Sequence, residues 1–193
     1  MLTMEQPTND RAGAHDALRR RTIVLVGLMG AGKTSVGKRL AAELDMPFRD
    51  ADDEIEQAAG LTIPEIFELY GEERFREGER RVAQRLLGDA PHVLATGGGA
   101  FMDPATREAI KTNAVSVWLK ADIEVLARRV ARKDTRPLLS GKDPREVLTR
   151  LAAVREPVYA LADLTIESGE RPHAATVAAI IEGLTALAEK DPA

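Results

Sequence analysis

Cysteine is absent from this chain of 193 residues. Its absence excludes a disulfide framework and a zinc site built on thiolate ligands, and it fits a cytoplasmic protein. Long apolar runs are also missing, because no stretch approaches the ~20 residues of a membrane-spanning helix. Residues 1–21 carry charges throughout and lack the apolar segment of a secretory signal peptide. We therefore expect a protein without membrane association.

An excess of positive charge is the third missing feature. The formal net charge is −4 and the isoelectric point is near 5.5. A general nucleic-acid-binding protein usually has a basic face, so we expect no nucleic-acid partner. The chain is long enough for one domain with a sizeable core. We expect a flexible extension over residues 1–20 and a single domain over residues 21–190, acting as a monomer.

The strongest local pattern is a glycine-rich segment that matches G-x-x-x-x-G-K-[ST], namely Gly27-Leu28-Met29-Gly30-Ala31-Gly32-Lys33-Thr34. It follows an apolar, β-branched run at 22–26, which predicts a buried strand, and it precedes helical spacing over 35–44. The glycines allow backbone N–H groups to point at phosphate oxygens, and the positive end of the helix strengthens the attraction. A turn that binds nothing is the disfavoured alternative. The pattern predicts a nucleoside triphosphate site at Gly30, Ala31, Gly32, Lys33, Thr34 and Ser35.

Strand-like and helix-like patterns alternate along the chain. Short apolar runs predict strands at residues 22–26, 47–52, 91–96, 114–119 and 164–166. Caps and helical spacing predict helices that begin near residues 35, 52, 62, 72, 104, 123, 144 and 173. This alternation predicts an α/β fold of three layers, with helices on both faces of a parallel sheet. Periodicity disappears over residues 132–142, where we expect a lid.

Signatures of other nucleotide-binding proteins are missing. No Asp-x-x-Gly follows Thr34, and Leu119-Lys120-Ala121-Asp122 has leucine where a guanine-reading signature needs asparagine or threonine. We interpret Asp122 as a helix N-cap, so a GTPase switch is disfavoured. The third predicted strand also lacks the terminal aspartate that holds Mg²⁺ in many P-loop ATPases, because it ends in Thr96-Gly97-Gly98-Gly99.

Carboxylates for the site must then come from the end of the second predicted strand. Asp50 and Asp52 are two residues apart, so on an extended chain they would project to the same side, next to the glycine-rich segment. We expect one to support Mg²⁺ through water and the other to contact a substrate hydroxyl; the alternative is an N-cap with a solvated neighbour. The glycines at 97–99 lie where α/β sheets bind ligands and would let a substrate approach the backbone, unless they are a flexible connection.

Three arginines complete the predicted site. Arg76 lies on a helix after the second strand, and Arg155 lies on a late helix; guanidinium groups suit bidentate binding of a carboxylate. Arg136 lies in the segment without periodicity and could act from a lid on a transferring phosphate. Each arginine alone would more often be a surface charge, so the prediction depends on the set.

Six segments together resemble the shikimate kinases in order and approximate spacing. They are Gly27 to Lys33, Asp50-Ala51-Asp52, Arg74-Phe75-Arg76-Glu77, Gly97-Gly98-Gly99, Arg136-Pro137-Leu138-Leu139 and Arg155-Glu156-Pro157-Val158-Tyr159. The resemblance covers the chain from about residue 21 to the final helix. It implies the nucleoside-monophosphate-kinase-like P-loop fold, with a five-stranded parallel sheet, a substrate-binding segment at about 50–88 and a mobile lid at about 132–142.

The resemblance also implies an activity and a set of substrate contacts. Shikimate kinases transfer the γ-phosphate of MgATP to the 3-hydroxyl of shikimate, in the biosynthesis of chorismate and aromatic amino acids. By this resemblance, Asp52 binds the shikimate hydroxyls and orients or deprotonates the attacking one. Arg76 and Arg155 bind the shikimate carboxylate, and Gly98 contributes a backbone contact.

On the nucleotide side, the resemblance implies that Lys33 and Arg136 contact the γ-phosphate. It makes Thr34 a direct ligand of Mg²⁺ and Asp50 an outer-shell ligand. Arg129 and the loop near Arg171 would lie beside the adenine. The chain departs from the family in two respects. Lys33-Thr34-Ser35 stands where many members have Lys-Ser-Thr, which keeps a hydroxyl for the metal, and the extension before Arg21 is longer than in compact members.

Two alternatives come from different classes of protein. A gluconate-type kinase of the same fold would also need an arginine clamp and an aspartate, but the glycine triplet and the Arg136-Pro137-Leu138-Leu139 segment favour shikimate. A degenerate kinase that only senses nucleotides or binds partners is the non-enzyme alternative. The intact set of Lys33, Asp52 and the three arginines argues against it.

Overall fold

The computed structural model describes residues 18–131 and 143–190. Within them, five parallel strands form one sheet in the order β2-β3-β1-β4-β5. The strands are β1 Thr22–Val26, β2 Phe48–Asp50, β3 Val93–Ala95, β4 Ala114–Lys120 and β5 Leu164–Glu167. All residues of β1 are buried, as expected for a central strand covered on both faces. The predicted α/β fold with a five-stranded parallel sheet is confirmed.

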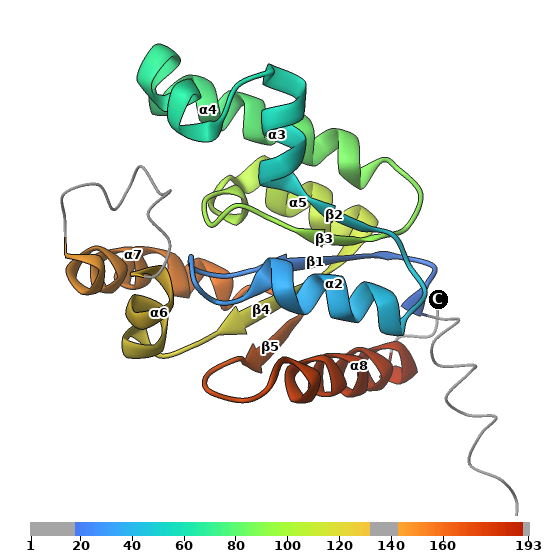
Figure 1. Cartoon of the computed structure of the whole chain (residues 1–193). Coiled ribbons are helices and arrows are strands. Elements are labelled where there is room, and N and C mark those ends of the chain that lie inside the picture. Colours follow the sequence, from blue (N-terminus) through green and yellow to red (C-terminus); the bar gives the residue numbers. More distant parts are fainter. Residues whose placement is uncertain (1–17, 132–142, 191–193) are drawn as a thin grey trace, which may run out of the picture.

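Helices cover both faces of this sheet (Figure 1). Helices α2 and α8 lie side by side on one face, and α5 lies on the other. The helices of the described part are α2 Lys33–Glu43, α3 Ala51–Ala59, α4 Ile63–Leu87, α5 Pro104–Asn113, α6 Ile123–Val130, α7 Pro144–Tyr159 and α8 His173–Lys190, with a 3₁₀ turn η1 at Ala100–Met102. None of these helices combines the length and apolar character that a membrane crossing requires.

Local sequence signals set most of the helix boundaries. The Thr62 side chain accepts from the Glu65 N–H, and the Glu65 side chain accepts from the Thr62 N–H, which forms a capping box at the predicted start of α4. Gly71 adopts φ +78° and ψ 174°, so it interrupts α4 where a break was predicted. Asp103 caps α5 through the Thr106 N–H. Asp122 occupies the N-cap position of α6, although its side chain makes no capping hydrogen bond.

The strand predicted over residues 47–52 is wrong at its carboxyl end. Strand β2 stops at Asp50, and Asp52 already lies in the first turn of α3. The Asp50 carboxylate caps this helix by accepting from the Asp52 N–H at 3.1 Å. Acidic residues in the first turn favour an early helix start, because they interact with the positive end of the helix dipole. The two carboxylates are therefore placed by a helix N-terminus and not by strand alternation.

Close packing of α2 against β2 brings the second strand to the glycine-rich loop. A Cβ atom at Gly37 would lie 2.6 Å from Phe48 Cε2, so glycine is needed where the phenyl ring meets the helix. On the other side of the sheet, Trp118 is buried in the core and its ring centroid lies 5.9 Å from that of Tyr159. Packing on both faces therefore keeps the carboxyl ends of the strands together at one edge of the sheet.

Candidate functional site

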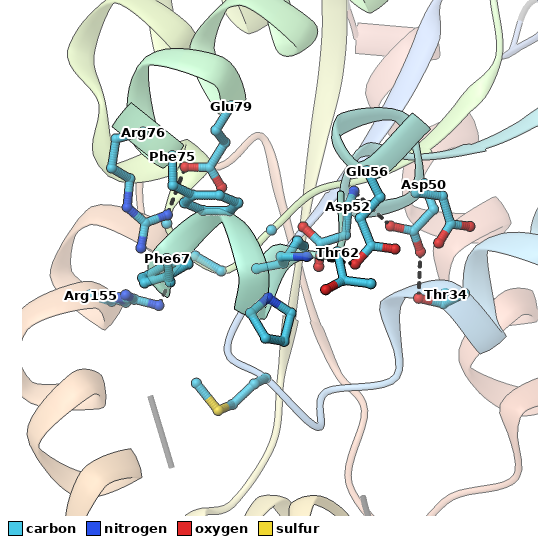
Figure 2. A pocket seen from close by; sticks show the side chains of 17 residues that line it. Thr34, Asp50, Asp52, Glu56, Thr62, Phe67, Phe75, Arg76, Glu79 and Arg155 are labelled. Carbon is cyan, nitrogen blue, oxygen red and sulfur yellow. Dashed lines mark hydrogen bonds and ion pairs between the residues drawn. The ribbon is translucent and has the colours of Figure 1, made fainter. Parts of the chain in front are cut away.

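A cavity of about 550 Å³ opens at the carboxyl ends of β1, β2 and β3 (Figure 2). This edge is where open parallel sheets bind ligands. The cavity is lined by residues of the glycine-rich loop, α3, α4, the glycine triplet and α7: Met29, Thr34, Asp50, Asp52, Asp53, Glu56, Thr62, Ile63, Pro64, Phe67, Phe75, Arg76, Glu79, Gly97, Gly98, Gly99 and Arg155. The predicted residues Thr34, Asp50, Asp52, Arg76, Gly98 and Arg155 are thus brought together.

Charge is divided between the two ends of the cavity. Figure 2 shows Arg76 and Arg155 at one end, and Asp50, Asp52 and Thr34 at the other. At the acidic end, burial and the neighbouring Asp50 carboxylate raise the pKa of Asp53. A ligand with a carboxylate at one end and hydroxyl groups at the other would match this division.

The glycine-rich loop has its carbonyl groups held by donors. The Lys33 ammonium donates to the carbonyls of Gly27 at 2.8 Å and Leu28 at 3.0 Å. Arg129 Nη1 donates to the Gly30 carbonyl at 3.1 Å, and Ser168 Oγ reaches the Ala31 carbonyl at 3.2 Å.

In a trans peptide the N–H group points away from the neighbouring C=O group. Donors on the loop carbonyls therefore turn the following N–H groups the other way, which favours an anion. Gly30 and Gly32 have φ of +84° and +93°, values that residues other than glycine rarely adopt. The loop opens directly into α2, whose first turn contains no acid that would oppose a phosphate.

Thr34 and Asp50 form a pair beside this loop. Thr34 Oγ1 donates to Asp50 Oδ2 at 2.7 Å. A hydroxyl and a carboxylate are oxygen ligands of the kind that Mg²⁺ prefers. In the described part of the chain, no group of three or more histidine, aspartate or glutamate side chains could enclose a metal. A magnesium ion with one or two protein ligands, water and nucleotide phosphates fits these residues.

Gly97 makes room for two carboxylates. A Cβ atom at Gly97 would lie 2.5 Å from Glu79 Oε1 and 3.0 Å from Asp52 Oδ1. Any larger residue would push these groups apart. The glycine triplet thus leaves room for the carboxylates of Glu79 and Asp52, in addition to the expected close approach of a substrate to the backbone.

Glu79 is a site residue that sequence reasoning missed. Its carboxylate is 4% exposed and pairs with Arg76 Nη1 at 2.7 Å, while the exposed Glu72 pairs with Arg76 Nη2 at 3.1 Å. Burial opposes the charge on Arg76, but Glu79 and Glu72 outweigh it and raise the pKa of the guanidinium. A Cβ atom at Gly99 would lie 2.1 Å from Arg76 Nη1. The spacing of three residues between Arg76 and Glu79 on one helix was the available signal.

Arg155 approaches the triplet from α7. Its side chain is largely buried, and Nη1 donates to the Gly98 carbonyl at 2.9 Å. Arg76 and Arg155 therefore contact neighbouring residues of the same loop, although they come from different helices. This places two guanidinium groups where they can bind one carboxylate.

Arg129 joins the glycine-rich loop to the loop that precedes α8. Besides Gly30, it donates through Nη2 to the Gly169 carbonyl at 2.6 Å. Arg171 is exposed two residues further along. The structure thus places Arg129 beside the glycine-rich loop. Sequence reasoning missed Ser168, a buried residue of the loop before α8 whose Oγ lies 3.2 Å from the Ala31 carbonyl and 3.2 Å from the Lys120 carbonyl at the end of β4. Arg136 and the predicted lid at 132–142 lie outside the described residues.

Comparisons with known proteins agree with this geometry. The family model described as "Shikimate kinase" matches residues 29–185. A shikimate kinase of Caulobacter vibrioides is 62% identical over 167 residues, which are 86% of this chain and 84% of the relative. A solved shikimate kinase of Acinetobacter baumannii, in complex with shikimate, superposes with a TM-score of 0.86 at 38% identity, over 90% of this chain and 98% of that one.

A gluconokinase structure from Sinorhizobium meliloti bears on the alternative substrate. It superposes with a TM-score of 0.59 at 20% identity, over 89% of this chain and 95% of that one. A likeness at this level of identity shows a common fold alone.

Proposed function

The chain belongs to the shikimate kinase family, and from this premise we propose that it transfers the γ-phosphate of ATP to the 3-hydroxyl of shikimate. The products are shikimate 3-phosphate and ADP. The observation that carries the proposal is the division of charge in the cavity, with two arginines at one end and Asp52 beside the glycine-rich loop at the other. Shikimate has its carboxylate and its hydroxyl groups on opposite sides of one ring, which suits this division.

Asp52 and the two arginines orient the acceptor in this mechanism. Arg76 and Arg155 bind the carboxylate of shikimate, and a backbone N–H of the triplet around Gly98 adds a hydrogen bond. Asp52 accepts a hydrogen bond from the attacking hydroxyl and takes its proton as the bond to phosphorus forms. Phosphoryl transfer depends mainly on such positioning and on neutralising charge, so the protein supplies little covalent chemistry.

Lys33 and Arg136 are proposed to neutralise the γ-phosphate. The Lys33 ammonium already lies on the loop, held by two carbonyls, and needs only a side-chain rotation to meet a phosphate. The backbone from Gly30 to Ser35 binds the remaining phosphate oxygens. We assign Arg136 to the lid on the family resemblance, and Arg129 to a place beside the adenine.

Thr34 and Asp50 are proposed to hold Mg²⁺, Thr34 directly and Asp50 through water. The ion would reduce the negative charge of the β- and γ-phosphates. The hydrogen bond between Thr34 Oγ1 and Asp50 Oδ2 shows that both groups face the place proposed for the ion.

We also propose that the enzyme is a cytoplasmic monomer. One chain supplies Arg76, Arg155 and Asp52, the groups to which the proposal gives the substrate contacts. Light scattering during size-exclusion chromatography would measure the molar mass in solution, and a mass of two chains would contradict the proposal. Cell fractionation would test the compartment.

One coupled assay of ADP release would test the proposed function. Shikimate, gluconate and nucleoside monophosphates are supplied separately with MgATP, and we expect turnover with shikimate alone. Turnover with gluconate would favour the other kinase of this fold. ATP binding without turnover on any acceptor would favour a nucleotide-sensing module.

Replacing Glu79 by glutamine is expected to raise the KM for shikimate about tenfold or more, because a hydrogen-bonded charge that fixes Arg76 is lost. Steady-state kinetics with shikimate varied at saturating ATP would measure the effect. Glu72→Gln is the matched control, since Glu72 pairs with the same guanidinium from an exposed position and should change KM by less than about twofold. Equal effects of the two variants would contradict the special role of the buried partner.

Replacing Ser168 by alanine is expected to raise the KM for ATP about threefold to tenfold, because one donor to the glycine-rich loop is removed. The KM for shikimate should not change. Kinetics with ATP varied at saturating shikimate would separate the two. The exposed Thr165 of β5 provides a control variant, Thr165→Ala, and a similar rise there would show that the effect is not specific to the loop.

A further inference from the structure

The Gly98 carbonyl accepts hydrogen bonds from two side chains of α7. One donor is Arg155 Nη1, at 2.9 Å, and the other is the Tyr159 hydroxyl. Arg155 and Tyr159 are four residues apart on the helix, so both side chains lie on the same face. The carbonyl of the central glycine in the triplet is thus held by a cation and by a neutral hydroxyl.

Tyr159 is rigidly placed for this contact. Its side chain has no exposed surface, and its ring packs against Trp118 at a centroid distance of 5.9 Å and Phe101 at 6.4 Å. Burial raises the pKa of the Tyr159 phenol, so the hydroxyl keeps its proton and acts as the donor. A ring buried in this way often serves packing alone. The Tyr159 hydroxyl, however, donates to the glycine triplet, the loop against which Arg76 and Arg155 also lie.

The orientation of the peptide group between Gly98 and Gly99 follows from this contact. Peptide groups are planar, so holding the Gly98 carbonyl toward α7 points the Gly99 N–H away from α7. The triplet has no side chains to hold it by packing, and glycine has the largest backbone freedom to lose. A donor at Gly98 therefore restricts the part of the backbone that has the least intrinsic order.

We propose that Tyr159 is a positioning residue for shikimate, which holds the Gly98 carbonyl so that the glycine triplet keeps its shape while Arg155 also binds the substrate carboxylate. The inference rests on the proposed function. Arg155 has two tasks in that function, because it donates to the Gly98 carbonyl through Nη1 and is proposed to bind the carboxylate as well. Tyr159 is not among the residues that line the cavity, so its hydroxyl can serve the Gly98 carbonyl alone.

Tyr159→Phe tests this role, because phenylalanine keeps the ring and removes only the hydroxyl. Isothermal titration calorimetry on the full chain would measure binding of shikimate and of ATP separately. We expect shikimate affinity to fall about fivefold to tenfold, the effect of one lost hydrogen bond, while ATP affinity stays unchanged. Tyr70→Phe is the matched control, since Tyr70 is the other tyrosine and is 60% exposed.

A merely structural role would give a different result. Equal weakening of shikimate and ATP, or unchanged shikimate affinity together with a lower melting temperature, would overturn the inference. Trp118 is the single tryptophan and adjoins Tyr159, so an unchanged emission spectrum in Tyr159→Phe would show intact packing. Wild-type protein that binds ATP but no shikimate would instead overturn the proposed function.

A second measurement does not depend on affinity. In ¹⁵N-labelled protein, the amide signals of Gly98 and Gly99 report the peptide that the hydroxyl holds. We expect these two signals to broaden or shift in Tyr159→Phe and to exchange with solvent faster, while the amides of the glycine-rich loop are unchanged. Unaltered signals at both glycines would overturn the inference even if shikimate binding weakened.

Discussion

Replacing Asp52 by asparagine is expected to lower kcat about a thousandfold, the range in which a positioned general base contributes. Asparagine has nearly the same shape, so the cavity should keep its form, but the amide cannot take the proton of the attacking hydroxyl. ATP binds from the side of the glycine-rich loop, and its affinity should remain. Single-turnover measurements of phosphate transfer, together with calorimetric titration of ATP, would separate chemistry from binding.

Asp53→Asn is the matched control for this prediction. Asp53 is the next residue in the first turn of α3 and also lines the cavity, but it is more exposed than Asp52, so its replacement removes one negative charge close to Asp52. We expect a change in kcat of less than about threefold, because an exposed charge near the site acts only through a screened field. A near-normal rate in Asp52→Asn would remove Asp52 from its proposed role. An equal loss of kcat in Asp53→Asn would show that the effect comes from the local electrostatic field and not from a general base.

Arg155→Ala should have the second largest effect, and it should act on shikimate. Truncating one partner of a largely buried, hydrogen-bonded charge pair costs about 2–5 kcal/mol, so we expect shikimate affinity to fall about a hundredfold or more. ATP affinity should not change, since Arg155 lies at the end of the cavity away from Thr34. Titration with each ligand would measure both quantities.

Two further variants on α7 sharpen this test. Arg155→Lys keeps the charge but removes the planar fork, so it should recover only part of the lost affinity. Arg150→Ala removes an exposed arginine from the same helix and should leave shikimate binding unchanged. Unchanged shikimate affinity in Arg155→Ala would show that Arg155 serves only to hold Gly98, and would contradict the clamp.

Elements with strong local signals were predicted well from the sequence. Strand β1, the glycine-rich loop and α2 follow from an apolar run, glycines and helical spacing that are contiguous in the chain. The Thr62 capping box and the break at Gly71 are equally local. Such features are stabilised by neighbours within a few residues, so the local sequence predicts them directly.

The conformation of Asp52 could not be obtained in the same way. The apolar and acidic residues near position 50 fit a strand end and a helix start equally well. The outcome depends on the Asp50 carboxylate, which accepts from the Asp52 N–H in the first turn of α3 and also from Thr34, sixteen positions earlier in the chain. The predicted proximity of both aspartates to the glycine-rich loop was right although the expected backbone was wrong.

The sequence by itself determined the family, the order of the elements and the identity of Asp52, Arg76 and Arg155 as site residues. Tertiary structure alone decided which of these groups touch. Ser168 and Arg129 hold the glycine-rich loop, and Tyr159 holds Gly98 from a distance of 61 residues along the chain. These contacts depend on the sheet order and on glycines whose missing side chains leave room for other groups, and no local pattern encodes a space that distant elements enclose.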